Sequence, residues 1–143
     1  MTTRSHVVFS IALSIVVVVA VVWGVAVVGP PGTARVQRFD QQRLEDLQTI
    51  FREVQSLCQD PDIKKELKRA LPDTLEELAV LARSERISLT DPETGRRYTY
   101  RVKDGTTYEL CATFSSERDS DVDVFWNHPS SRHCFTVDAL DPP

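Results

Sequence analysis

The sequence of 143 residues lacks the short motifs that mark the commonest catalytic centres. It contains no Gly-x-Ser-x-Gly nucleophile turn, no glycine-rich phosphate loop and no His-Glu-x-x-His zinc motif. It also lacks a clustered basic segment, because the net charge is +1 over residues 33–103 and −6 from residue 104 to the end. Nucleic-acid-binding proteins present a basic face to phosphates, so this distribution excludes that class. We therefore expect neither an enzyme nor a small-molecule substrate or cofactor.

The spacing typical of metal ligands is missing as well. His128, His133 and Cys134 are close in the sequence, but no second cysteine pair and no His-x₃-His spacing accompanies them. Residues 119–123 alternate acidic side chains as calcium loops do, yet the glycine at the sixth position and the glutamate at the twelfth are absent. The sequence thus predicts no metal site and a solvated acidic loop, and it assigns no role to the two histidines.

A long hydrophobic run dominates what is present. Residues 7–28 carry no charged side chain, and half of them are valine. As a helix this run is about 33 Å long, close to the hydrocarbon thickness of a bilayer. In lipid, a lone segment must satisfy its own backbone hydrogen bonds, which a helix does. After a tail over residues 1–6, the run predicts a transmembrane helix, with Phe9, Leu13, Trp23 and Gly24 as anchor residues facing lipid or a partner helix.

A cleaved secretory signal peptide is the alternative for the same run. The run is longer than the apolar core of such a signal, and the Gly-Pro-Pro-Gly of residues 29–32 is a poor cleavage context. These two features favour an uncleaved anchor. Because proline cannot donate a helical hydrogen bond, we expect the helix to end here and a linker to cover residues 29–38.

The remaining residues, 39–143, predict one domain whose first part, 39–83, is helical. Apolar residues recur at steps of three and four from Val36 to Cys58, while Arg43 and its charged neighbours fall mostly off that stripe. This pattern predicts an amphipathic helix, starting at Ala34 or Asp40 and ending at Gln59, that packs on the domain's own sheet. A coiled coil or a partner helix is the alternative.

Two shorter helices are expected to follow. Asp60 and Pro61 are typical of a helix start, and they predict a charged helical turn that ends before Pro72. Thr74 and Glu77 have the spacing of a capping box, which predicts a helix running to about residue 83.

From residue 84 the apolar residues alternate, which predicts strands. We expect a short strand at Ile87 and Leu89, a turn at 91–95, a hairpin, a polar loop over 115–123 and a last strand over 134–140. Burial favours a three-residue hairpin loop, 103–105, with a left-handed Gly105. That loop would place Tyr98 opposite Leu110 and Tyr100 opposite Tyr108. Their rings, with Phe114 and Trp126, are expected in the core.

The three cysteines carry the most specific covalent prediction. Cys111 and Cys134 share a face of the predicted sheet, so a disulfide between them is favoured, and it would imply an oxidising compartment. Two separate reduced thiols are the alternative. A Cys–His dyad with His128 would compete for the same sulfur, and it is the basis of a third hypothesis, a thiol or redox enzyme. Cys58 is expected to be a buried small apolar residue.

Membrane orientation is contested within the sequence. Arg4 precedes the hydrophobic run, whereas Arg35, Arg38 and Arg43 follow it, and this count places the domain in the cytoplasm. The predicted disulfide argues for the opposite side. We expect a periplasmic or external domain attached to the inner membrane.

The order of features resembles a group of uncharacterised bacterial single-pass membrane proteins. The likeness is carried by Leu71-Pro72 with Leu75 and Leu78, by the Asp-Pro-Glu-Thr-Gly of 91–95 with Tyr98 and Tyr100, by the Tyr-Glu-Leu-Cys-Ala of 108–112 with Phe114, and by Trp126, His128, Arg132, Cys134 and Phe135. That group implies no activity. The layout is also loosely similar to type IV pilins and pseudopilins. The acidic residue that pilins carry near the start of their apolar helix is absent here, and the Gly-Pro-Pro-Gly segment interrupts the helix.

Together these patterns predict an α+β fold, with a transmembrane helix followed by an amphipathic helix on a small antiparallel sheet. We expect a non-catalytic, membrane-anchored accessory or structural subunit whose partners are the lipid bilayer and a larger membrane protein complex. A pseudopilin-like assembly subunit is the alternative.

Overall fold

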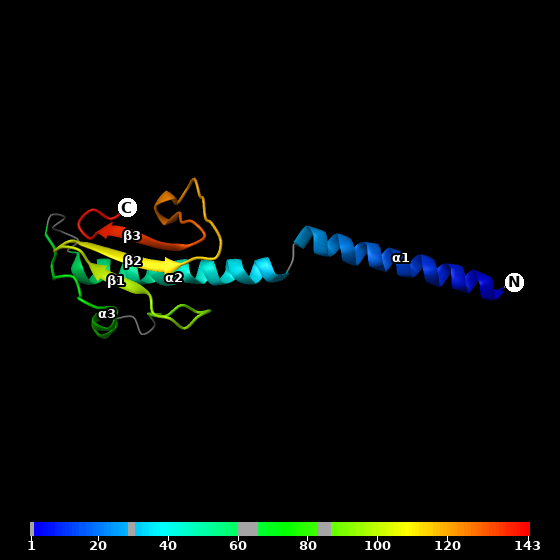
Figure 1. Cartoon of the computed structure of the whole chain (residues 1–143), viewed down its shortest axis with the longest axis horizontal. Helices are drawn as coiled ribbons and strands as arrows, with labels where there is room; N and C mark the ends of the chain where they lie inside the picture. Colours follow the sequence, from blue (N-terminus) through cyan, green and yellow to red (C-terminus); the bar gives the residue numbers. More distant parts are fainter. Residues whose placement is uncertain (1, 29–30, 60–65, 83–86) are drawn as a thin grey trace. The chain divides into compact units, whose positions relative to one another are not determined.

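The computed structural model describes residues 2–28, 31–59, 66–82 and 87–143. The chain divides into two compact units, Met1–Arg35 and Val36–Pro143. The order of elements is three α-helices, two strands, a 3₁₀ turn and a third strand (Figure 1). This is the α+β layout that the sequence predicts, with a long apolar helix before a small antiparallel sheet.

Helix α1 (Thr2–Val28) makes up most of the first unit. Its large apolar side chains, from Val7 to Val27, are all more than half exposed. The helix is therefore apolar on every side and buries none of this surface in the protein. The helical stretch that starts at His6 is long and apolar enough to cross a membrane, although a signal sequence near the N-terminus passes the same test.

Helix α2 (Pro31–Cys58) begins inside the segment 29–38 that the sequence predicts as a linker. The difference has a local cause, because proline is well tolerated in the first turn of a helix and residues 32–38 contain no further proline. Residues 29 and 30 of the expected linker lie outside the described residues. The predicted apolar stripe is confirmed, since Leu47, Ile50 and Val54 are fully buried.

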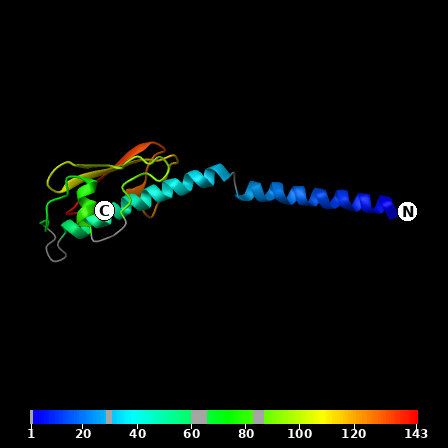
Figure 2. The ribbon, with the colours of Figure 1, turned by 90° about the horizontal axis from the view of Figure 1, so that it is seen from below.

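The second unit is built on one antiparallel sheet in the order β1-β2-β3, formed by β1 (Thr99–Val102), β2 (Thr107–Thr113) and β3 (Arg132–Asp138). Helix α2 runs along one face of this sheet (Figure 2). Buried residues of α2 and of the strands belong to one apolar core, which includes Leu47, Tyr108 and Val137. The expected aromatic core is confirmed for Tyr98, Tyr108, Phe114 and Trp126, and Tyr100 packs against it partly buried.

The hairpin register differs by two residues from the prediction. Tyr100 lies opposite Leu110, and Val102 lies opposite Tyr108. The loop is 104–106 instead of 103–105, because the Asp104 carboxylate accepts the backbone N–H groups of residues 106 and 107 at 3.0 and 2.7 Å. Among the described residues only Gly95 is left-handed, so Gly105 is not. A shift of two keeps every side chain on its face, and burial therefore cannot distinguish the two registers.

Between α2 and β1, the first of the two predicted shorter helices is not confirmed in its described part and the second is. Helix α3 (Leu75–Leu81) begins at Thr74, whose hydroxyl accepts the N–H of Glu77 at 3.1 Å, as the capping box predicts, and it ends two residues early. The helix expected after residue 60 lies partly outside the described residues. Its described end is not helical, because Leu67 pairs as an isolated bridge with Gln59.

The strand expected at Ile87 and Leu89 does not form. Both side chains pack against the core, but their segment makes only an isolated bridge, between Thr90 and Arg97. The turn at 91–95 is present, and Gly95 is its left-handed residue at φ 68°. After β2, residues Val124–Trp126 form a 3₁₀ turn, η1.

Candidate functional site

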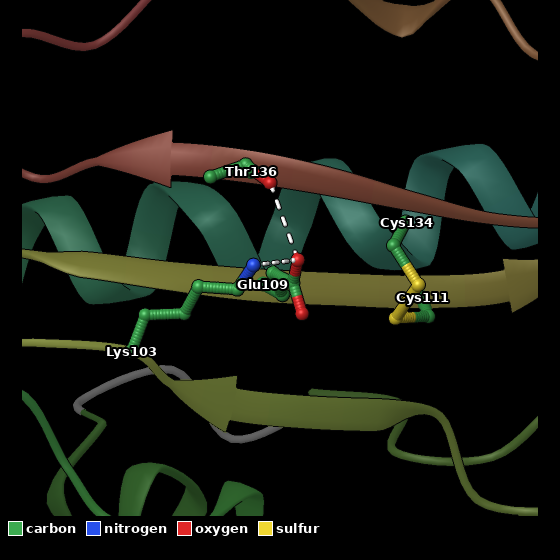
Figure 3. The surroundings of a disulfide bond; sticks show 5 residues. All are labelled: Lys103, Glu109, Cys111, Cys134 and Thr136. Carbon is green, nitrogen blue, oxygen red and sulfur yellow. Dashed lines mark hydrogen bonds and ion pairs between the residues drawn. A yellow bond between two sulfur atoms is a disulfide. The ribbon is translucent and has the colours of Figure 1, made fainter.

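A disulfide joins Cys111 of β2 to Cys134 of β3, directly across the ladder. The two Cα atoms are 4.0 Å apart, and the bond lies on the face of the sheet turned away from α2 (Figure 3). The sequence predicted this pair from the shared face of the two residues, and the register explains it, because residues opposite each other bring their Cβ atoms close. While the bond is closed, neither sulfur can serve as a nucleophile.

Polar side chains continue along the same outer face. Glu109 accepts hydrogen bonds from Lys103 at 2.6 Å and from the Thr136 hydroxyl at 3.4 Å (Figure 3). The bond from Lys103 is the main cause that lowers the pKa of Glu109. This surface is thus polar and cross-linked, whereas the opposite face is the core.

The third cysteine is different. Cys58, at the C-terminal end of α2, is free and fully buried, and its sulfur lies 3.8 Å from the carbonyl oxygen of Ala70. Burial raises the pKa of the thiol, which keeps it protonated and unreactive. The expectation of a buried small apolar residue is confirmed.

Within the described parts of the chain, the most extensive charged cluster surrounds Arg43, which the sequence placed off the apolar stripe. The Arg43 side chain is 2% exposed, and its guanidinium contacts Asp40 at 2.7 Å, Asp91 at 2.5 Å and Glu93 at 2.5 Å. Two bonds run to Asp91, from Nε and Nη2, so the pairing is bidentate. A buried charge must be paired to persist, and here one cation is held by three carboxylates.

The two buried carboxylates of this cluster also organise the loops around it. Asp40 accepts the backbone N–H groups of Ser115 and Ser116 at 2.9 and 2.7 Å, and the Ser116 hydroxyl at 2.6 Å. Asp91 accepts the N–H groups of residues 93 and 94, which closes the turn. The cluster therefore ties α2 to the turn before β1 and to the loop after β2.

Burial and pairing act in opposite directions on these groups. Burial would raise the pKa of Asp40, but the bonds from Ser116, Ser115 and Arg43 outweigh it and lower the pKa. For Asp91, burial is likewise outweighed by Arg43 and the turn N–H groups, and its pKa is lowered too. Burial would lower the pKa of Arg43, whereas the bonds to its carboxylates raise it. All three groups are charged at neutral pH.

His128 is buried and stacks on Phe114, with ring centroids 3.5 Å apart. Burial lowers its pKa below the usual 6.5, which favours the neutral ring. His133 contacts Phe135 edge-on. Within the described parts of the chain, no three His, Cys, Asp or Glu side chains come together as metal ligands. The two histidines therefore pack against the aromatic core.

The predicted anchor residues lie along α1. Phe9, Leu13 and Trp23 are 70, 56 and 72% exposed. A Cβ added to Gly24 would meet no atom within 4 Å. The apolar side chains of this helix are exposed on all sides, so the structure does not mark one side of α1 as the interacting one.

The sequence did not reveal the Arg43 cluster, because Asp91 and Glu93 are 48 and 50 residues away from Arg43. A signal was present in Asp40 and Arg43, which are three residues apart on one side of a helix, and in the Asp-Pro-Glu-Thr-Gly turn, whose first residue accepts backbone N–H groups. Neither pattern alone says that the two segments meet.

No protein-family model, no curated protein and no solved structure matches this chain.

Proposed function

We propose that the protein is a single-pass inner-membrane protein, anchored by α1, whose cross-linked domain lies on the periplasmic or external side. There it serves as a non-catalytic accessory or structural subunit of a larger membrane protein complex. The observation that carries this proposal is the disulfide-linked sheet that follows an apolar helix with no buried surface.

The disulfide supports the periplasmic or external side of the membrane. Such bonds persist in oxidising compartments and are rare in the bacterial cytosol. The arginine count near the membrane points to the other side, but it is a bias in insertion, whereas the bond between Cys111 and Cys134 requires oxidation of both thiols. We therefore give the disulfide more weight.

The non-catalytic role is supported by how the reactive groups are occupied. Cys111 and Cys134 are bonded to each other, Cys58 is buried, and the Arg43 guanidinium is neutralised by carboxylates of its own domain. These groups stabilise the fold. The surfaces that remain for binding other proteins are that of α1 and the polar surface of the domain.

Two experiments test this proposal. Alkaline phosphatase fused after Pro143 should be active, and a green fluorescent protein fused at the same position should be dark, because the domain is outside the cytosol. The full chain, extracted from its own membranes with a mild detergent, should purify with the same membrane protein at fixed stoichiometry. A dark phosphatase fusion, or a chain that always purifies without a partner, would contradict the proposal.

A pseudopilin-like assembly subunit is the second candidate, and one observation favours it. An apolar helix, α1, precedes α2, and α2 packs on an antiparallel sheet, an order of elements that pilins share. Filaments in the electron microscope, or a processed N-terminus by mass spectrometry of the purified chain, would support this candidate. An unprocessed N-terminus without filaments would exclude it. The resemblance to bacterial single-pass membrane proteins of no known activity fits the first candidate.

A further inference from the structure

A small cavity of about 190 Å³ lies between α2 and the loop that follows β2. Sites that bind whole small molecules usually measure about 300–1,000 Å³, so this cavity is sized for the end of one side chain. Leu44, which is buried, gives it an apolar contact. The polar part of its wall includes the amides of Gln37 and Gln41 on α2 and, from the loop, Glu117, Arg118 and His128.

His128 supplies an unpaired hydrogen-bond acceptor to this cavity. The residue is 5% exposed, and its Nδ1 donates to the carbonyl oxygen of Pro129 at 3.3 Å, which leaves the lone pair on Nε2. Among the described residues no group donates to Nε2. Because burial lowers the pKa of this ring, the ring is neutral at neutral pH and its lone pair can accept an N–H group from a ligand.

The surroundings of the cavity are acidic. Among the described residues, the lining side chains and their ion-pair partners carry two guanidinium groups, those of Arg43 and Arg118, and five carboxylates, those of Asp40, Asp91, Glu93, Glu117 and Asp123. The net charge of this set is −3, and it is −2 when the exposed Arg38, next to Gln37 in the sequence, is included. The charge of the site therefore favours a cation over an anion.

Glu117 is the lining carboxylate that is free to bind such a cation. The Asp40 oxygens already accept N–H and O–H groups of the protein, and Asp123 pairs with Arg118. Glu117 is exposed, and in the described part of the chain it forms no ion pair. A ligand in the cavity thus meets a charged acceptor in Glu117 and a neutral acceptor in His128.

We propose that the cavity binds the guanidinium group of an arginine side chain from a subunit of the partner complex. The inference rests on the proposed function, because it names a feature of that partner. A guanidinium is planar and has five N–H donors, so it can donate to His128 Nε2 and to the Glu117 carboxylate together. Its aliphatic stem would contact Leu44. The ammonium group of lysine is more strongly hydrated and therefore fits a small cavity less well.

The test is a titration of the full chain in a neutral detergent, with carbon-13 in its histidine rings. The chain has three histidines, and the ring signal of His128 is assigned by its loss in His128→Phe. The probe is a capped glycine-arginine-glycine peptide, and the control peptide carries citrulline, whose uncharged urea group replaces the guanidinium. The arginine peptide should shift the His128 signal to saturation and leave that of His6 unchanged. It should bind at least about tenfold more tightly than the citrulline peptide, because hydrogen bonds from a charged donor are the stronger ones.

Two substitutions that change the charge equally locate the site. Glu117→Gln removes the free carboxylate and should weaken binding of the arginine peptide about threefold, the usual effect of one exposed ion pair. Glu66→Gln removes an exposed carboxylate outside the cavity, and it should leave the affinity unchanged. Both positions are exposed, so both variants should fold, and near-ultraviolet circular dichroism checks this.

Three outcomes would each overturn the inference. They are the absence of a saturable shift of the His128 signal, equal affinity for the two peptides, and equal effects of Glu117→Gln and Glu66→Gln. These outcomes are distinguishable from a failure of the proposed function. A missing shift in a chain that purifies with a partner at fixed stoichiometry contradicts only the role of the cavity, whereas a chain that always purifies alone contradicts the proposed function.

Discussion

Replacing Arg43 by methionine should destabilise the domain more than any surface substitution. The side chains of Arg43, Asp40 and Asp91 are 2, 6 and 9% exposed, so the substitution leaves two buried carboxylates without their cation. Removing one partner of a buried ion pair costs about 3–5 kcal/mol. Domains of this size have an unfolding free energy of about 5–15 kcal/mol. Arg43→Met thus removes a large share of the stability.

Thermal unfolding of the full chain in detergent, followed by near-ultraviolet circular dichroism, measures this loss. A change of 1 kcal/mol shifts the Tm of a small domain by about 4–8 °C, so we expect Arg43→Met to lower the Tm by at least about 12 °C. Arg52→Met is the matched control on the same helix, because Arg52 is exposed and, among the residues that the structure describes, bonds only to Gln48 and Thr49 of its own helix. It should change the free energy of unfolding by less than about 0.5 kcal/mol.

A compensated variant tests the cause. In Arg43→Met with Asp40→Asn and Asp91→Asn, no buried charge is left unpaired, and the asparagines still accept the loop N–H groups. Part of the lost Tm should return. The reasoning is refuted if Arg43→Met lowers the Tm by less than about 4 °C, or if the compensated variant is no more stable than Arg43→Met.

The same cluster predicts a dependence on acid. The pKa values of Asp40 and Asp91 are lowered below the usual 3.8, so the unfolded chain binds protons before the folded one does. The stability that these two carboxylates contribute is fully present above their usual pKa of 3.8. It is lost as the pH falls through their lowered pKa values in the folded state. The Tm difference between the wild type and Arg43→Met should therefore shrink below about pH 4. A constant difference from pH 7 to pH 2 would contradict this account.

Three further outcomes are expected. Replacing Cys111 and Cys134 together by alanine should lower the free energy of unfolding in urea by about 3 kcal/mol, because the bond joins residues 23 positions apart and so closes a loop in the unfolded chain. A loss below about 1 kcal/mol would contradict that role. Replacing His128 by phenylalanine keeps the stacking on Phe114 and should flatten the pH dependence of the Tm just below pH 6.5, where the folded wild type resists protonation; an unchanged slope would contradict it. Replacing the fully buried Leu47 by alanine should cost about 2–5 kcal/mol, and a neutral result would contradict its place in the core.

The features that the sequence predicted correctly are those with a local or periodic cause. The stripe around Leu47 and Ile50 has the helical period, Thr74 has a capping partner three residues on, and Cys111 and Cys134 alternate with inward apolar neighbours. Each of these signals lies within one element, or depends only on which face of the sheet a residue occupies.

The errors have different physical causes. The hairpin loop was placed one residue early because burial is the same in both registers, and the Asp104 carboxylate decides between them. Ile87 and Leu89 alternate as residues of a strand do, but in the described part of the chain their segment makes only an isolated bridge, between Thr90 and Arg97. Arg43 looked like a surface residue because its partners, Asp91 and Glu93, are in another part of the chain.

The central claim is that an anchored domain carries its disulfide outside the cytosol, and thiol labelling of spheroplasts tests it most directly. In a Cys58→Ala variant, Cys111 and Cys134 are the only cysteines. A membrane-impermeant maleimide should give no labelling of intact spheroplasts before treatment with an impermeant reductant and two labels per chain after it. Labelling only after lysis, without any reductant, would show reduced cysteines in the cytosol and contradict the account.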